Sequence, residues 1–104
     1  MGPKAKDVLS AVTDFNLSPK NFPSFSYREI DIGYANSIRA MNLTHTGEQG
    51  WVLYIPNEFA LHVYQTLVKA GKNNGLRHAG YYAMRSLRIE RFYAFWGQDM
   101  VIFF

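Results

Sequence analysis

Three arginines near the end of the chain offer the clearest opportunity for chemistry. Arg85, Arg88 and Arg91 recur three residues apart within an apolar helical pattern. Their guanidinium groups could hold a carboxylate or a phosphate, because the planar guanidinium donates two parallel hydrogen bonds to such groups. The commoner outcome is a solvated helix face partly neutralised by Glu90, and we favour that interpretation.

Aromatic side chains follow these arginines. The cluster comprises Phe92, Tyr93, Phe95 and Trp96. Flat rings in this position could stack a heterocyclic ligand, but packing in a core is the commoner use of such a cluster and is the one we expect. The Phe95-Trp96 pair precedes Gly97, so the chain should leave the helix axis there and fill an edge of the core.

No other residues indicate catalysis or metal binding. His45, His62 and His78 lack the HxxxH or HxH spacing of a metal site, so we predict none. Glu29 and Asp31 alternate on one predicted strand and are interpreted as solvent-facing charges rather than as a general acid and base. Nucleophile, phosphate-loop and dinucleotide motifs are absent. The sequence therefore predicts no catalytic residue.

Length and composition limit the remaining possibilities. A chain of 104 residues forms at most one domain, yet it carries 8 Phe, 7 Tyr and 2 Trp and is 48% hydrophobic. Some of this apolar surface should be exposed, which indicates a partner surface or a piece of a larger protein whose neighbour would cover it. The net charge of +3 is spread along the chain and gives little support for nucleic-acid binding.

The chain contains no cysteine, which excludes disulfides and thiol chemistry. No apolar run reaches the roughly 18 residues of a membrane span, and the N-terminus does not resemble a signal peptide.

The first half of the chain should supply a helix, a connector and a strand. Apolar residues at helical spacing predict an amphipathic helix from Pro3 to Val12. Asn, Ser and two prolines make residues 14–23 a connector to which we assign no chemistry. Alternation from Ser26 to Ile32, closed by Gly33, predicts a half-buried strand.

Two further strands should form a hairpin. Residues 38–45 and 51–55 flank the glycine-bounded turn 46–50. The second strand is continuously apolar, and we therefore expect it to be buried on both faces.

The last third should be helical. Asn57 is expected to cap a helix that ends at Gly71, and a second helix of about three turns should begin between Ala79 and Gly80. The apolar band predicted for this second helix comprises Ala79, Tyr82, Ala83, Leu87, Ile89, Phe92 and Tyr93. The order helix, three strands, two helices predicts an α+β fold, with an antiparallel sheet and helices packed on one face.

Two stretches carry a resemblance to a known family. The turn Thr46–Trp51, Thr-Gly-Glu-Gln-Gly-Trp, and the run Arg85–Glu90, Arg-Ser-Leu-Arg-Ile-Glu, followed by Phe95–Asp99, resemble the aminomethyltransferase domain of the glycine-cleavage T-protein family. The resemblance extends from Gly2 to Met100. It implies that residues 1–104 are part of a folate-binding domain of this type, as a fragment of a larger protein.

The resemblance also identifies the positions that would hold tetrahydrofolate. The family carries a glutamate where this chain has Val52 and an arginine where it has Met84, so both polar anchors are replaced by apolar side chains. Arg85 replaces an aspartate of the family, whereas Glu48 in the turn is retained. Possible remaining contacts to an anion or another ligand are Glu48, Arg85, Arg88 and Trp96.

Within the family, the sequence looks most like the branch of pyruvate dehydrogenase phosphatase regulatory subunits. That likeness implies a non-catalytic regulatory or interaction module in the mitochondrial matrix, with the rest of the parent protein and the catalytic subunit of the phosphatase as partners. FAD would bind in an upstream half that this chain lacks, so we expect no cofactor here. The alternatives are a fragment of a folate-dependent dimethylglycine or sarcosine dehydrogenase and, third, a small basic nucleic-acid binder.

Overall fold

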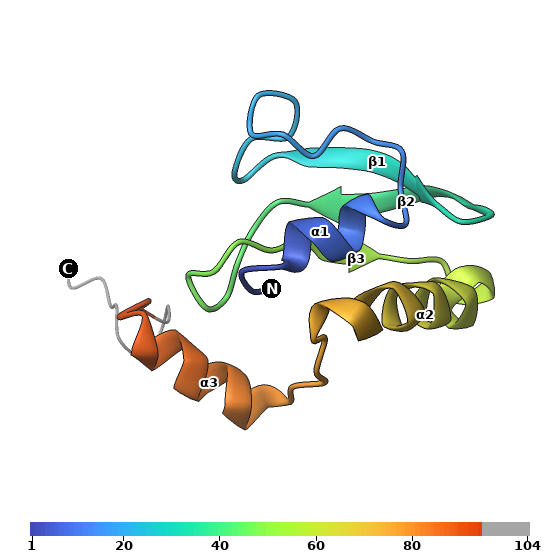
Figure 1. Ribbon diagram of the computed structural model, residues 1–104. Helices are drawn as coiled ribbons and strands as arrows, with labels where there is room; N and C mark the ends of the chain where they lie inside the picture. The colour runs from blue at the N-terminus through green and yellow to red at the C-terminus, as the bar shows by residue number, and fades with distance from the viewer. Residues whose placement is uncertain (95–104) are drawn as a thin grey trace.

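A computed structural model of the chain describes residues 1–94 and has the predicted α+β architecture. Its elements are α1 (Ala5–Ser10), β1 (Tyr27–Ile32), β2 (Ala35–Met41), β3 (Val52–Tyr54), α2 (Asn57–Gly71), the 3-10 turn η1 (Lys72–Asn74) and α3 (Tyr81–Glu90). The strands form one antiparallel sheet in the order β1-β2-β3. Figure 1 shows α1 in front of the strands, α2 beside the sheet and α3 set apart from the other elements.

The first hairpin joins β1 to β2. Ile30 and Ile32 are buried while their strand neighbours are exposed, which confirms the alternation predicted for β1. The second strand begins at Ala35, three residues earlier than predicted. The residue pattern does not show this early start, because the pairing register shifts between Ile30 and Ile32 and because Ser37 has a φ of 57°. The apolar residues of β2 therefore do not simply alternate.

The predicted second hairpin is confirmed, since β2 and β3 pair antiparallel. Burial of β3 on both faces was wrong. Only three residues form this strand, it lies at the edge of the sheet, and the side chain of Tyr54 is 56% exposed. A continuous apolar run does not distinguish a central strand from an edge strand whose outer face is uncovered.

The core lies between the sheet and the helices α1 and α2. Its buried members are Leu9, Leu17, Phe22, Ile30, Ile32, Ala35, Ile38, Ala40 and Val63. Phe22 comes from the connector and packs edge-on against Phe15 and Trp51, with ring centroids 5.8 and 6.3 Å away. The connector that carried no predicted role therefore supplies the largest side chain of the core.

The helix α2 has the bounds predicted for it, but Asn57 does not cap it. Pro56 occupies the N-cap position, no side chain caps the helix, and Asn57 is its first residue. At the sheet, the His62 ring of α2 stacks on Tyr34 at 3.5 Å between centroids, and its Nε2 accepts the Tyr34 N–H at 3.2 Å. These contacts fix α2 to the turn of the first hairpin.

The helix α1 is shorter than the predicted segment and ends at Ser10 rather than Val12. Within residues 1–94, none of the helices combines the length and hydropathy that crossing a bilayer requires.

Candidate functional site

The turn that carries Glu48 is shaped by a threonine. The Thr44 Oγ1 accepts two backbone N–H groups, those of Thr46 and Gly47, both at 3.1 Å. Gly47 has a φ of 83°, a conformation that glycine adopts without the steric cost borne by other residues. The turn therefore presents Glu48 in a defined position between β2 and β3.

The C-terminal end of α3 docks on this turn. Glu48 Oε1 lies 3.1 Å from Arg91 Nη1, so an ion pair joins the two segments. A Cβ on Gly47 would lie only 3.2 Å from the Tyr93 ring, which shows how closely the chain after α3 approaches the turn. At the other end, Gly80 caps α3 in an extended conformation, as its predicted position near the helix start required.

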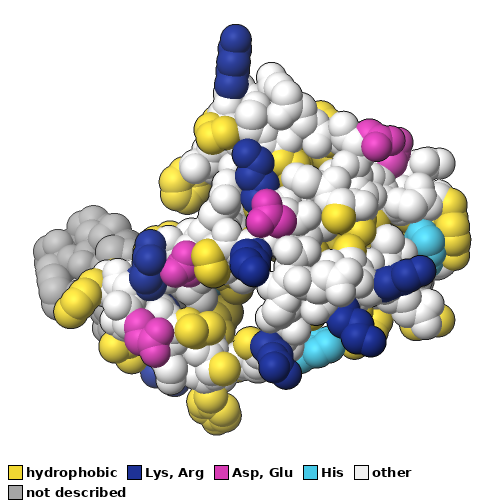
Figure 2. Space-filling model, viewed as in Figure 1, with side chains coloured by type: hydrophobic (Ala, Val, Ile, Leu, Met, Phe, Trp, Pro, Cys, Tyr) yellow, Lys and Arg dark blue, Asp and Glu magenta, His cyan; other side chains and the backbone are white. Residues whose placement is uncertain are grey.

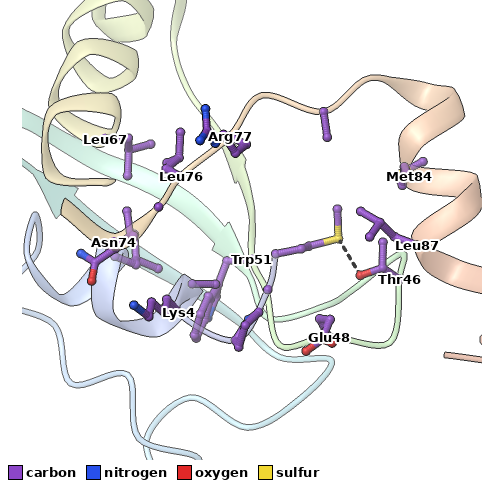
Figure 3. A pocket seen from close by; sticks show the side chains of 18 of the residues that line it. Lys4, Thr46, Glu48, Trp51, Leu67, Asn74, Leu76, Arg77, Met84 and Leu87 are labelled. Atoms are coloured by element: carbon purple, nitrogen blue, oxygen red, sulfur yellow. Dashed lines mark hydrogen bonds between the residues drawn. The ribbon is translucent and has the colours of Figure 1, made fainter. Parts of the chain in front are cut away.

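A cavity of about 890 Å³ lies between α3 and the rest of the described chain. Its apolar lining includes Val8, Leu53, Leu67, Leu76, Met84 and Leu87. Figure 3 shows Met84 and Leu87 on the α3 side and Leu67 and Leu76 on the α2 side, with Trp51 and Glu48 between them. The cavity is therefore a mainly apolar space with charged groups at its margin.

The structure brings only some of the predicted site residues together. Glu48 and Met84 both line the cavity, whereas Val52 does not. Val52 is adjacent to Leu53 in β3, and successive strand residues point to opposite faces of the sheet. Because Leu53 faces the cavity, Val52 faces the other side, and the two positions where the family carries its folate anchors do not share one cavity here.

The predicted solvated arginine face was wrong for Arg88. This side chain is only 6% exposed, and its Nη1 donates to the carbonyl of Tyr93 at 3.4 Å. The chain turns back after α3, because the Phe92 and Tyr93 N–H groups bond to carbonyls of the last helical turn, and it thereby covers the guanidinium. Arg85 is half-buried, with its guanidinium carbon 5.7 Å from the Tyr81 ring centroid.

Core packing of the aromatic cluster was wrong for Phe92, whereas Tyr93 is half-buried against the turn at Gly47. Phe92 is 97% exposed, and Tyr82 and Ile89 of the predicted apolar band are 82% and 62% exposed. Figure 2 shows hydrophobic side chains over α3 at the lower left of the molecule. Exposed apolar surface was expected from the composition, and α3 carries much of it. Trp96 and the Phe95-Trp96 turn lie outside the described residues.

Arg91 and Trp51 belong to the cavity although the site prediction named neither. Arg91 was recognised only as part of the arginine series, and the signal that could have singled it out is the acidic turn at Glu48. Among residues 1–94 no three histidine, acidic or cysteine side chains gather in a way that could hold a metal ion.

Replacing Glu48 with Gln should lower the free energy of unfolding by less than about 1 kcal/mol, because the Glu48–Arg91 pair is 31% and 54% exposed and is screened by water. Urea denaturation at low and at high salt would measure the effect, which should shrink as salt rises. Asp14→Asn, at an exposed carboxylate outside this ion pair, is the matched control. A loss of several kcal/mol would contradict the expectation.

Comparison with known proteins shows which proteins this chain is similar to. Residues 1–102 match the family described as the GCVT N-terminal domain. The chain is 55% identical over 100 residues to the mitochondrial pyruvate dehydrogenase phosphatase regulatory subunit of Mus musculus, a match that covers 96% of this chain and 11% of that protein.

Two other relatives are enzymes by name. The mitochondrial sarcosine dehydrogenase of Mus musculus is 39% identical over 99 residues, covering 95% of this chain and 11% of the enzyme. The aminomethyltransferase of Thermoanaerobacter sp. (strain X514) is 33% identical over 100 residues, covering 95% of this chain and 26% of the enzyme. The chain thus spans about a tenth of the length of the two mitochondrial relatives.

Proposed function

Since the chain belongs to the GCVT N-terminal domain family, we propose that it is a non-catalytic regulatory or interaction module in which the folate contacts of the family are lost. The similarity to a phosphatase regulatory subunit over 96% of the chain supports this function. The proposal extends to a location in the mitochondrial matrix; the names of the relatives support the mitochondrial location by resemblance.

The observation that carries the proposal is the apolar character of the two folate-anchor positions. Val52 and Met84 stand where the resemblance places a glutamate and an arginine. Neither a valine nor a methionine side chain can donate a hydrogen bond or pair with a charge. Each lost bond to a charged group costs about 1.5–3 kcal/mol, so two losses weaken folate binding by about a hundredfold or more.

The partners follow from the same proposal. The module contributes a folded surface to a longer protein, and the catalytic subunit of pyruvate dehydrogenase phosphatase is its binding partner. Exposed apolar side chains on α3 (Tyr82 and Ile89) and just after it (Phe92) support an interaction role, because such a surface is suited to docking. The module needs neither FAD nor tetrahydrofolate for this role.

Titration calorimetry with tetrahydrofolate tests the loss of folate contacts. The wild-type chain should show no binding at micromolar ligand, whereas Met84→Arg, which restores the one anchor position that lines the cavity together with Glu48, should bind at least about tenfold more tightly than wild type. Circular dichroism first establishes that each chain is folded.

The matched control is Ile89→Arg, which adds the same charge at a side chain that is 62% exposed. It should not bind. Micromolar binding by the wild type would contradict the proposal. It would favour the second candidate, a piece of a folate-dependent dimethylglycine or sarcosine dehydrogenase. The 39% identity to sarcosine dehydrogenase and the retained Glu48 support this candidate.

A further inference from the structure

The strand register defines a second surface on the side of the sheet away from the cavity. Tyr27 pairs with Met41, and Met41 pairs with Val52, so these three residues form one row across the sheet. Glu29, Arg39 and Tyr54 form the neighbouring row in the same way. Paired residues point to the same face. We name the six residues Tyr27, Glu29, Arg39, Met41, Val52 and Tyr54 the outer sheet face.

All the described helices lie on the opposite side. The core residues of α1 and α2 pack with Ile30, Ile38 and Ala40, whose side chains point away from the outer sheet face. The third helix reaches the cavity, which is lined by Leu53 on that same core side. Within residues 1–94, therefore, no helix covers the outer sheet face.

This uncovered face is largely apolar. The side chains of Tyr27 and Tyr54 are 47% and 56% exposed, and Met41 and Val52 lie half-buried between them. Valine in place of the family's glutamate makes the row Tyr27, Met41, Val52 free of charge. A sheet face of this composition is stabilised when a second apolar surface removes it from water.

The charges on the face are one acid and one base at neighbouring positions. Glu29 and Arg39 are cross-strand partners, and the Tyr27 hydroxyl donates to Glu29 Oε1 at 2.8 Å. That hydrogen bond raises the pKa of the Tyr27 phenol and fixes the Glu29 carboxylate next to the Tyr27 hydroxyl. The Arg39 side chain is exposed and forms neither an ion pair nor a hydrogen bond with another side chain in the described range.

We propose that the outer sheet face binds a second copy of this chain, with the two faces stacked about a two-fold axis so that Glu29 of each copy pairs with Arg39 of the other. A two-fold interface requires a self-complementary surface. This face meets the requirement, because its apolar row meets its own equivalent and because its single acid and single base exchange partners across the axis. Complementary charges of this kind fix the register of an interface.

The small size of the face limits the association. Six residues are far fewer than the roughly 20–30 residues that each partner contributes to a standard interface. The dimer should therefore be weak and concentration-dependent, with a dissociation constant on the order of 10–100 μM, as weak encounters with small interfaces have.

Sedimentation equilibrium on the chain, from about 5 to about 500 μM, brackets that range. The wild type should shift from monomer to dimer. Arg39→Glu and Glu29→Arg should each remain monomeric at least about tenfold beyond the wild-type midpoint, because like charges then face each other across the axis. The double variant Glu29→Arg, Arg39→Glu should dimerise again, since it restores opposite charges. Glu29 and Arg39 are both exposed on the surface. Circular dichroism checks the fold of each variant.

Ile89→Arg is the control, because it places a charge on the exposed face of α3 and leaves the outer sheet face unchanged. This variant should dimerise like the wild type. A wild type that is monomeric up to the highest concentration overturns the proposal. So does a dimer that the single charge variants do not weaken, a double variant that stays monomeric, or a dimer that Ile89→Arg disrupts.

Discussion

Replacing Phe22 with alanine should lower the free energy of unfolding by about 3–5 kcal/mol, the range found for buried aromatic side chains. The ring is fully buried and packs on Phe15 and Trp51, so its removal leaves a cavity between the connector and the sheet. A domain of this size is stabilised by only about 5–15 kcal/mol, so the loss is a large part of the total. Urea denaturation followed by circular dichroism measures it.

Phe25→Ala is the control for this substitution. Its side chain is 83% exposed and lies three residues further along the chain, between the connector and β1, so the same change should alter stability by less than about 0.5 kcal/mol. If the two variants lost similar amounts, Phe22 would not be the buried anchor that the structure describes.

Replacing Gly33 with alanine should lower the free energy of unfolding by about 3 kcal/mol, from two additive causes. Gly33 has a φ of 59°, a left-handed conformation that costs an alanine about 1–2 kcal/mol. A Cβ there would also lie 2.3 Å from the His62 Nε2, the atom that accepts the Tyr34 N–H. The His62 ring would have to move away from the turn, which disrupts the contact that joins the hairpin turn to α2.

Gly75→Ala separates the two causes. Gly75 has a φ of 74°, but a Cβ there would meet no heavy atom within 4 Å, so only the conformational cost of about 1–2 kcal/mol should remain. Thermal unfolding of the two variants compares them directly. Equal losses would show that the close approach of His62 to the hairpin turn contributes nothing to stability.

The sequence predicted the elements well where a strong period or a glycine marked them. The bounds of α2, the alternation of β1 and the hairpin of β2 with β3 agree with the structure. Predictions failed where the environment decides the outcome. The burial of β3 depends on what lies beside it in the sheet, and the early start of β2 depends on the conformation of Ser37, neither of which is visible in a residue pattern.

The candidate site was predicted less completely, for a similar reason. The motif positions Glu48 and Met84 meet at one cavity, but Val52 faces the other side of the sheet because strand residues alternate. Arg88 was assigned to solvent from its charge and spacing. Its burial results from the chain reversal at Phe92 and Tyr93, which a helical period cannot reveal because it lies beyond the end of the helix.

The order of the strands in the sheet has a consequence for how the protein is made. Each strand pairs only with its neighbour in the sequence, so each pairing closes a short loop. Folds dominated by such local contacts form quickly, and chains emerge from the ribosome N-terminus first. The three strands can therefore meet before α2 has emerged from the ribosome. Val63 then arrives on α2 and closes a core whose other buried members are already in place.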